Sequence, residues 1–394
     1  MRRIAANYIF PVLSEPLKNG IIELDEQDRI LGIIDSKGEL SESRNLEFYN
    51  GVIVPGFVNT HCHLELSELK NRLAKKRGLP FFIRQMIEYR KQNPTDFTFQ
   101  AIKEADERMV QNGIVAAGDI ANTGTSIDVK KKSQIFYHTF VEVSGLGADY
   151  RERYDAARKL SRAFQQQNLS SSVVPHAPYS VSVDLFRLIQ HSARKDDSIL
   201  SIHNQESKEE NEMFMQGSGK LFKALKAAGV NLSRWEKSER SSLRSIMDFL
   251  PLKNHILFVH NLYSTAPEIK QVSEQFPNSY WVLCPSSNRY IENKLPDFNA
   301  FLPFSDKVTL GTDSLASNQT LSVLDEMKTI NRHFPGIAFQ KMLQWATLNG
   351  ARALKIEGRY GSLEKGKSPG LNLISGFDFE KMQITEDSTV KRIA

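Results

Sequence analysis

The sequence predicts an α/β protein, a (β/α)8 TIM barrel with a small β-sandwich domain built from both chain termini. Three observations indicate this fold class. Short apolar strands alternate with helical stretches through the middle of the chain, both ends are rich in short strands with polar turns, and side chains that can bind a metal follow several of the apolar strands. Parallel strands joined by helices bring their carboxyl ends to one face, so we expect a single site there.

The two ends of the chain share one pattern of short strands separated by polar turns. The predicted strands are Ile4–Val12, Gly20–Glu23, Ile30–Asp35 and Leu46–Tyr49 near the start, and Leu371–Ile374 near the end. We therefore assign residues 1–54 and 358–394 to a small β-domain and residues 55–357 to the barrel.

The middle of the chain supplies the barrel strands. The first is the apolar run Val52–Val58, and the others are Gly113–Ala117, Gln134–Val143, Ser171–Val174, Ser198–Ile202, His255–Val259, Tyr280–Leu283 and Lys307–Leu310. Predicted helices between them include Thr98–Gln111, Ala148–Gln167 and Leu321–Arg332. An open, doubly wound sheet is the alternative, but no glycine-rich phosphate-binding sequence follows the first strand.

Composition excludes several classes of protein. The 394 residues are 40% hydrophobic and carry a formal net charge of +5, and basic runs such as Lys130–Lys132 indicate solvated faces because aromatics do not alternate with them. We expect no nucleic-acid partner and no membrane span, since no run approaches the roughly 20 apolar residues that spanning requires. The start of the chain predicts a strand rather than a leader peptide. Two cysteines, Cys62 and Cys284, favour a reducing, cytoplasmic location.

Four strand ends carry side chains that can bind a metal. His61 and His63 stand two residues apart at the end of the first apolar run, so both imidazoles point to one face, about 6 to 7 Å apart along an extended backbone. Such a pair alone also fits two polar residues that end a strand. However, His203, His260 and Asp313 each follow another apolar strand. We assign His61, His63, His203 and Asp313 as the metal ligands.

This ligand set indicates the metal and its chemistry. Three imidazoles and a carboxylate suit one divalent ion, Zn²⁺ first and Fe²⁺ as the alternative. An open coordination position would hold water and lower its pKa, which supplies hydroxide near pH 7. The pattern therefore predicts a metal-dependent hydrolase.

Further residues could move protons or contact a substrate. Glu206, three residues beyond His203, could take a proton from water and pass it to a leaving group, or it could simply begin the helix that Ser207 indicates. His260 could hydrogen-bond the hydroxide, or it could be a structural histidine. His176 lies in the turn after another strand and is a candidate substrate contact, while Cys284–Asn288 either shapes the same rim or forms an ordinary turn.

These motifs together resemble a known superfamily. The segment Pro55–His63, His203 with Glu206, His260, and Leu310–Ser314 are similar to the ordered signatures of the amidohydrolase superfamily, in particular its deaminase and chlorohydrolase branch. The resemblance covers nearly the whole chain and implies that Glu206 is the proton shuttle and that His260 and Asp313 assist the hydroxide. It also implies a mononuclear site, because no lysine candidate for a bridging carbamate stands out.

A narrower resemblance concerns the substrate. The stretches His61–Ser67, His176–Ser180 and Asp313–Asn318 resemble the aminofutalosine deaminases and related enzymes that act on adenine nucleosides. This similarity implies hydrolytic deamination of a 6-aminopurine nucleoside, with aminofutalosine first and adenosylhomocysteine or adenosine next. It implies four substrate contacts: Glu65, His176, Ser314 and Asn318. Glu65 could equally be a salt-bridged wall residue. We expect a homodimer that acts on a small molecule.

Other activities remain open at this point. The same site would serve hydrolysis of a cyclic amide, replacement of a ring chlorine by water, or deamination of guanine or cytosine. A catalytically silent binding protein is the alternative outside the enzymes, although no ligand is missing. Residues 207–250 predict a lid without a pattern that indicates the substrate.

Overall fold

Two four-stranded parallel sheets form the centre of the protein. The computed structural model describes residues 1–40, 45–93, 99–233 and 235–394. One sheet contains β6 (Phe57–Cys62), β7 (Ile114–Ala121), β8 (Phe136–Val143) and β9 (Ser170–Pro175), and the other contains β10 (Leu200–Asn204), β11 (Ile256–His260), β12 (Ser279–Leu283) and β13 (Val308–Leu310). Every pair of neighbours runs parallel. The predicted α/β fold with parallel sheets is confirmed.

Backbone hydrogen bonds join the two sheets at both edges. The amide of His203 in β10 donates to the carbonyl of His176, just after β9, at 3.0 Å. On the other edge the amides of Thr312 and Asp313, just after β13, both donate to the carbonyl of His61 in β6 at 3.0 Å. The strands therefore follow one another in chain order, with their carboxyl ends on a common side.

Apolar side chains and one glycine explain the close packing of these strands. All residues of β7 are buried, as expected for a parallel strand covered on both faces. A Cβ on Gly118 would lie 2.7 Å from the carbonyl oxygen of Thr60 and 2.8 Å from the Phe140 ring. Only glycine lets β6 and β8 approach β7 this closely.

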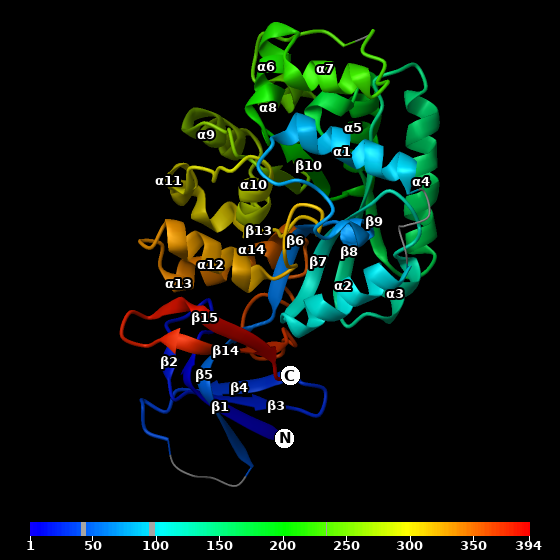
Figure 1. Cartoon of the computed structure of the whole chain (residues 1–394). Coiled ribbons are helices and arrows are strands. Elements are labelled where there is room, and N and C mark those ends of the chain that lie inside the picture. The colour runs from blue at the N-terminus through cyan, green and yellow to red at the C-terminus, as the bar shows by residue number, and fades with distance from the viewer. Residues whose placement is uncertain (41–44, 94–98, 234) are drawn as a thin grey trace.

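Helices surround the parallel strands (Figure 1). Several begin at a serine whose hydroxyl accepts the amide hydrogen three residues later: Ser182, Ser207, Ser241 and Ser322. The α-helices are α1 (Leu79–Gln92), α2 (Phe99–Gln111), α3 (Ile127–Lys132), α4 (Tyr150–Gln165), α5 (Val183–Asp196), α6 (Lys208–Gln216), α7 (Lys220–Ala227), α8 (Ser242–Ile246), α9 (Ala266–Gln275), α10 (Pro285–Ile291), α11 (Phe298–Phe301), α12 (Val323–His333), α13 (Phe339–Ala346) and α14 (Leu348–Ala353). Short 3-10 helices are η1 (Leu64–Leu69), η2 (Pro178–Ser180), η3 (Met247–Phe249) and η4 (Leu302–Lys307).

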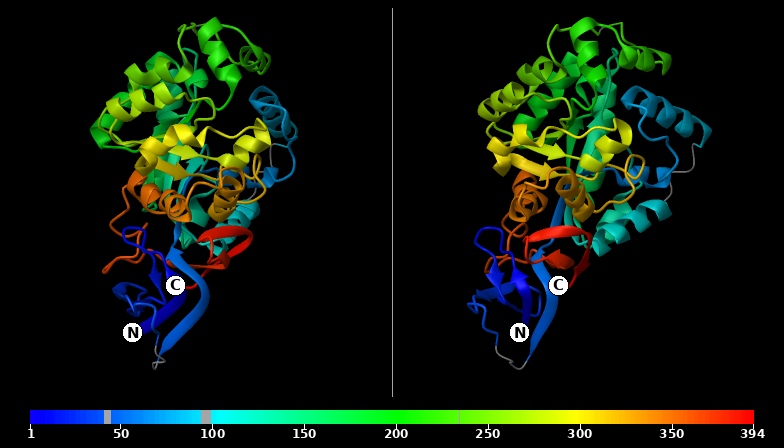
Figure 2. Two further views of the ribbon diagram at one scale, coloured as in Figure 1. Left: turned by 90° about the vertical axis from the view of Figure 1, so that its left-hand side faces the viewer. Right: turned by 60° about the vertical axis from the view of Figure 1, so that its left-hand side comes forward.

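A third sheet draws strands from both ends of the chain and lies beyond one end of the central strands (Figures 1 and 2). Its order is β15–β14–β5–β1–β3–β4, with β2 paired to β1. The strands are β1 (Arg2–Ile9), β2 (Leu17–Lys18), β3 (Ile21–Leu24), β4 (Ile30–Ile34), β5 (Leu46–Pro55), β14 (Leu371–Asp378) and β15 (Gln383–Arg392). This is one mixed sheet; the sandwich packing, the closed barrel and the domain boundaries stay predictions.

Most element boundaries lie within a few residues of those predicted. The strand predicted to run to Val12 ends at Ile9, because Pro11 removes a donor and Val12 has a positive φ of 82°. Strand β15 was not predicted, since its alternating residues are mostly polar and half exposed. Thr98, the predicted start of α2, lies outside the described residues. Within the described ranges, the helices are too short or too polar to cross a lipid bilayer.

Candidate metal centre and active site

The four predicted metal ligands converge at the carboxyl ends of β6, β10 and β13. The Nε2 atoms of His61 and His63 are 3.2 Å apart, and those of His63 and His203 are 3.3 Å apart. Asp313 places Oδ1 at 3.7 Å from Nε2 of His61 and 3.5 Å from Nε2 of His63. All four residues are at most 8% exposed.

The spacing of these atoms fits one shared ion. Zinc–imidazole bonds of about 2.0 to 2.1 Å in a tetrahedral site put two nitrogen atoms about 3.3 to 3.4 Å apart. Nε2 of His63 faces two other Nε2 atoms, yet a neutral imidazole nitrogen offers either one proton or one lone pair. Burial lowers the pKa of His63 to about 4, so the ring is neutral at pH 7. A cation between the nitrogens satisfies all three lone pairs, and the donor set therefore fits a metal.

His203 is oriented by a contact on its far side. Its Nδ1 donates to the backbone carbonyl of His176 at 2.7 Å, which leaves the Nε2 lone pair pointing at the other imidazoles. Glu142 of β8 places Oε2 4.0 Å from the same Nδ1. Sequence analysis missed Glu142, because it lies inside a strand and nothing in the local pattern marks it.

Asp313 is held by two serine hydroxyls. Ser287 and Ser317 each donate to its Oδ2 at 2.6 Å, so Oδ1 is left to face the imidazoles. Burial acts to raise the pKa of Asp313, but the contact with His61 and the other imidazoles outweighs burial and holds the pKa well below its usual range. Both serines lie in segments that sequence analysis marked, although it gave neither residue a role.

Left-handed backbone turns the chain at two of these strand ends. Asp313 has a φ of 57° and His260 a φ of 74°. Residues other than glycine rarely adopt this region, and each costs on the order of 1 kcal/mol. Backbone hydrogen bonds, from the amide of Asp313 to His61 and from that of Asn261 to Asn204, hold the chain in this conformation at the two strand ends.

Glu206 and His260 face each other beside the imidazoles. Oε1 of Glu206 is 3.8 Å from Nε2 of His260, and the ring of His260 stacks on that of His203 with centroids 5.6 Å apart. Burial, and next the charge of Asp313, raise the pKa of Glu206 well above its usual value. Burial therefore favours the protonated form of this carboxyl group, the form that can donate a proton. Ser207 caps α6, so the position that starts the helix is filled by the next residue.

Each of the four predicted substrate contacts already makes hydrogen bonds within the protein. Nδ1 of His176 bonds the hydroxyl of Ser180 at 2.7 Å, and its ring lies 5.0 Å from that of His203. Glu65 accepts hydrogen bonds from the amide of Asn122 at 3.0 Å and the hydroxyl of Thr123 at 2.8 Å. The side chain of Glu65 thus already anchors the loop after β7.

The other two predicted contacts lie in the loop after β13. The amide nitrogen Nδ2 of Asn318 donates to the carbonyl of Thr312 at 2.8 Å and to Oε1 of Glu326 at 2.7 Å. The hydroxyl of Ser314 is 3.3 Å from that of Ser317. Both residues hold this loop, and a direct contact with substrate stays a prediction.

A buried ion pair lies next to the segment that carries His61 and His63. Nζ of Lys130 is 2.6 Å from Oδ2 of Asp119, and neither side chain is exposed. The Oδ1 atom of Asp119 accepts from the amide of Leu64 at 2.8 Å and from Sγ of Cys62 at 3.4 Å. Cys62 therefore points away from the imidazoles. The prediction that Lys130 is solvated is wrong, because the side chain turns inward to Asp119 and to Thr139.

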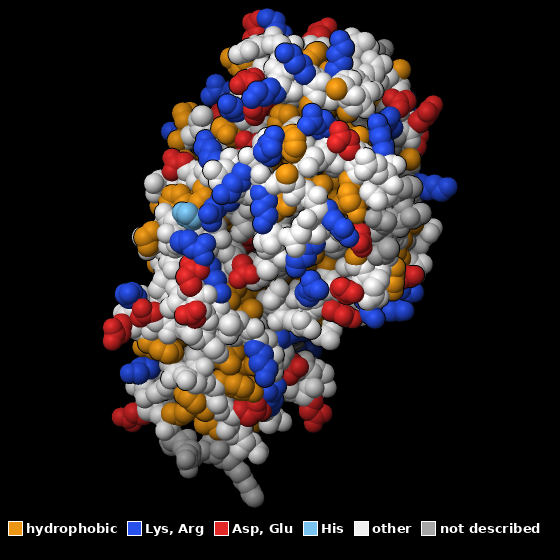
Figure 3. Space-filling view, in the orientation of Figure 1, with side chains coloured by type: hydrophobic (Ala, Val, Ile, Leu, Met, Phe, Trp, Pro, Cys, Tyr) orange, Lys and Arg blue, Asp and Glu red, His pale blue; other side chains and the backbone are white. Residues whose placement is uncertain are grey.

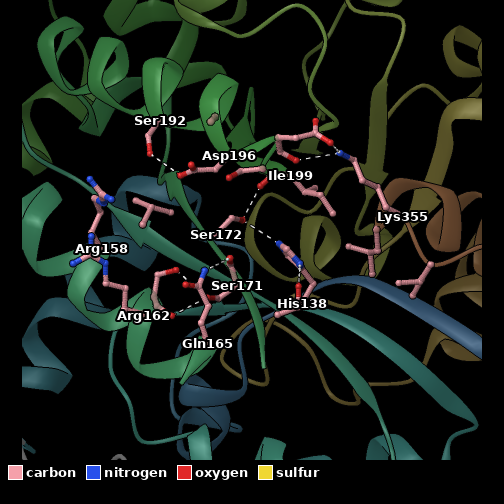
Figure 4. A pocket seen from close by; sticks show the side chains of 18 of the residues that line it. His138, Arg158, Arg162, Gln165, Ser171, Ser172, Ser192, Asp196, Ile199 and Lys355 are labelled. Carbon is pink, nitrogen blue, oxygen red and sulfur yellow. Dashed lines mark hydrogen bonds and ion pairs between the residues drawn. The ribbon is translucent and has the colours of Figure 1, made fainter. Parts of the chain in front are cut away.

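A separate hollow lies at the opposite end of the strands (Figure 4). It measures about 560 Å³ and is lined by the starts of β8 and β9, by α4 and by Lys355. His138 there bonds the hydroxyl of Ser170 at 2.7 Å through Nδ1 and that of Ser172 at 3.0 Å through Nε2. Both ring nitrogens are occupied, so this histidine is no part of the candidate metal centre.

This chain is similar to known proteins over most of its length. A model of the amidohydrolase family matches residues 52–392. An adenosine deaminase of Helicobacter pylori is 27% identical over 340 residues, which cover 84% of this chain and 80% of that protein. An aminodeoxyfutalosine deaminase of Nitratiruptor sp. is 27% identical over 339 residues, covering 82% of this chain and 79% of that protein.

Solved structures show the same fold. The Helicobacter pylori aminofutalosine deaminase in complex with methylthio-coformycin has a TM-score of 0.81 at 24% identity, with complete coverage of both chains. An adenosine deaminase from Xanthomonas campestris with bound zinc has a TM-score of 0.72 at 20% identity, covering 98% of this chain and 86% of that one.

Proposed function

This chain belongs to the amidohydrolase family, and from that premise we propose that it is a metal-dependent deaminase that hydrolyses the exocyclic C–N bond of a 6-aminopurine nucleoside and releases ammonia. One observation carries the proposal. The buried carboxyl group of Glu206, 3.8 Å from His260, lies beside the converging donor atoms of His61, His63, His203 and Asp313. A metal-ligand set next to a carboxylic acid that can donate is what hydrolytic deamination requires.

His61, His63, His203 and Asp313 would hold one divalent ion, Zn²⁺ first and Fe²⁺ as the alternative. The convergence of their donor atoms supports this assignment. When bound, the ion would lower the pKa of water at the site towards neutrality and so supply hydroxide near pH 7.

Glu206 would move the protons of the reaction. Its carboxyl group gives a proton to the ring nitrogen next to C6, which makes C6 accept the water oxygen. Of the two protons that water loses, one passes through Glu206 to the departing amine, and the other returns to Glu206 as the C6 oxygen becomes a carbonyl, which restores the acid. A C–O bond forms, the C–N bond breaks, and the products are the 6-oxopurine nucleoside and ammonia.

His260 and Asp313 would stabilise the oxygen as it attacks. Nδ1 of His260 lies 3.5 Å from the amide nitrogen of Asn288, which can donate to it, so Nε2 carries the ring proton and presents it to the site. Asp313 is ionised and accepts a hydrogen bond through Oδ1, because its other oxygen is occupied by two serines.

The substrate class is a 6-aminopurine nucleoside, with aminofutalosine first and adenosylhomocysteine or adenosine next. The relatives named as deaminases of adenosine, aminodeoxyfutalosine and 5-methylthioadenosine/S-adenosylhomocysteine support this class. We propose His176 as a direct contact, since its ring lies next to that of His203. Glu65, Ser314 and Asn318 complete the proposed set of contacts.

We also propose the fold, the oligomeric state and the cellular location. Eight parallel strands in chain order with hydrogen bonds at both seams support a TIM barrel over residues 55–357, and the terminal sheet supports a small β-sandwich domain from residues 1–54 and 358–394. We propose a homodimer in the cytoplasm, where the two buried cysteines stay reduced.

Ammonia release from a panel of substrates tests the function. Protein loaded with zinc is given aminofutalosine, adenosylhomocysteine and adenosine, and separately free guanine, free cytosine and a chlorinated heterocycle. We expect kcat/KM to be highest for a nucleoside. A clear preference for a free base would contradict the nucleoside assignment, chloride or ring-opened products would indicate the alternative hydrolases, and fully loaded protein without turnover would indicate a binding protein.

A further inference from the structure

The turn between β10 and α6 carries Glu206. Gln205, the first residue after β10, adopts a left-handed conformation with a φ of 45°. Glu206 follows, and Ser207 then caps α6 by accepting the amide hydrogen of Glu210 at 3.2 Å. Because the turn is this short, its backbone sets the place from which the side chain of Glu206 reaches into the site.

The carboxyl group of Glu206 has few contacts of its own. The residue is only 6% exposed, and Oε1 lies 3.8 Å from Nε2 of His260, which is beyond hydrogen-bond distance. Within the described ranges, the structure shows no donor that bonds this carboxyl group. The group is thus available to exchange protons, but its position depends on the backbone that carries it.

Glu210 holds that backbone with both oxygen atoms of its carboxyl group. Oε1 accepts the amide hydrogen of Gln205 at 3.1 Å, and Oε2 accepts that of Glu206 at 3.1 Å. A glutamate three residues after a serine cap usually accepts the amide hydrogen of the serine itself. Here the side chain reaches further back, so it fastens the turn as well as the start of the helix.

The carboxyl group of Glu210 lies away from water. Figure 3 shows charged side chains spread over the outer surface near α6 and α7, but Glu210 is 0% exposed. Burial raises the pKa of Glu210 to about 7, although the hydrogen bonds that it accepts act to lower this pKa. Burying such a group is unfavourable unless it is hydrogen-bonded. An apolar side chain would fill the same space but would leave the amides of Gln205 and Glu206 without this acceptor.

The other side of the turn is fixed through Gln205. Its carbonyl accepts the amide hydrogen of Tyr263 at 3.1 Å, and its Oε1 accepts the hydroxyl hydrogen of Ser264 at 2.5 Å. These contacts come from the loop after β11, whose last residue is His260. The turn is therefore joined to the neighbouring strand end on one side and to α6 on the other, and both attachments fix the backbone of Glu206.

We propose that Glu210 is a positioning residue that keeps the carboxyl group of Glu206 within reach of the water and of the ring nitrogen. The proposal rests on the proposed function, in which Glu206 moves the protons. Proton transfer requires hydrogen-bond distance, and a misplacement of 1 Å can slow a reaction by about 10²-fold. A change at Glu210 should therefore slow the reaction only while Glu206 is present to be positioned.

The first test is Glu210→Gln, which keeps the size of the side chain but replaces one accepting oxygen by an amide nitrogen. With the nucleoside that the substrate panel identifies, we expect kcat to fall by about 10- to 100-fold, while KM stays within about threefold and zinc content is unchanged. Glu212→Gln is the matched control, because Glu212 lies on the same helix but bonds neither amide, and its kcat should equal that of wild type. A wild-type kcat in Glu210→Gln would overturn the proposal.

A double variant separates positioning from a general structural role. In the Glu206→Gln protein no proton shuttle is left to position, so adding Glu210→Gln should lower the residual kcat by less than about twofold. A general structural defect would instead lower kcat by the same factor in both backgrounds. That result would contradict a role through Glu206.

A measurement without turnover separates this inference from the proposed function. Hydrogen–deuterium exchange followed by mass spectrometry reports on the amides of Gln205 and Glu206, which should exchange about tenfold faster in Glu210→Gln than in wild type or Glu212→Gln. If zinc-loaded wild type releases no ammonia from any nucleoside, the proposed function fails, and faster exchange still supports the hold of Glu210 on this turn. Unchanged exchange overturns it.

Discussion

Replacing Lys130 by methionine should destabilise the protein and loosen its metal ligands. Methionine keeps most of the side-chain volume but removes the ammonium group that lies 2.6 Å from Asp119. The carboxylate of Asp119 would stay fully buried and would keep, among the described residues, the amide of Leu64 and the thiol of Cys62 as hydrogen-bond donors.

The size of the effect follows from burial. Both side chains of the pair have no exposed surface, and removing one partner of such a pair costs about 3 to 5 kcal/mol, because the remaining charge is uncompensated. Asp119 also bonds the thiol of Cys62, which stands between His61 and His63, and the amide of Leu64, which follows His63. Loss of such support weakens metal binding by about 10- to 100-fold. We therefore expect both stability and zinc affinity to fall.

Urea unfolding of the metal-free protein and a competitive zinc titration measure the two effects. Lys131→Met is the matched control, because the neighbouring lysine is exposed and its ammonium group donates to the exposed side chain of Gln167 at 2.9 Å. The double variant Lys130→Met/Asp119→Leu should recover most of the free energy of unfolding, since no charge is left buried. A loss below about 1 kcal/mol in Lys130→Met, or the same loss in Lys131→Met, would refute the reasoning.

Three further predictions concern single residues. Glu206→Gln should keep its zinc, measured by elemental analysis, while kcat falls by about 10²-fold or more, and a rate near wild type would remove Glu206 from the mechanism. His61→Ala should lose zinc, whereas His138→Ala, whose ring bonds two serines, should retain it; equal zinc in both would remove His61 from the ligand set. Burial raises the pKa of Glu326 from 4.5 to about 8, so the folded state binds this proton more tightly than the unfolded state does. The resulting contribution to the free energy of unfolding is complete below pH 4.5 and is lost as the pH rises towards 8, by up to roughly 5 kcal/mol. Glu326→Gln should flatten this decline in urea unfolding between pH 5 and 8, and an unchanged slope would contradict the assignment.

Much of the candidate site was predictable because strand geometry is periodic. Residues at the ends of parallel strands share one face, and this rule predicts that His61, His63, His203 and Asp313 lie close together, as they do. The central strands were predictable for a similar reason, since apolar runs of four to eight residues indicate buried strands.

The supporting contacts were not predictable, because they join elements that are far apart in the sequence. Ser287 reaches Asp313 from helix α10, 26 residues earlier, and Glu142 stands among apolar residues with no local signal. Lys130 lies in a run of three lysines, and only the fold shows that one of them turns inward. The helices α6, α7 and α8 likewise leave no substrate pattern in the sequence.

The sheet that joins both termini also limits when its strands can pair during folding. Strand β5 pairs with β14, and Leu371 lies opposite Pro55, more than 300 residues earlier in the chain. During synthesis the edge of β5 that β14 later covers lacks this partner until residues 371–378 leave the ribosome. Such an edge invites pairing with other chains. Because Arg2 and Ile393 are hydrogen-bonded neighbours, linking the two ends and opening the chain at an exposed loop would let both strands emerge together.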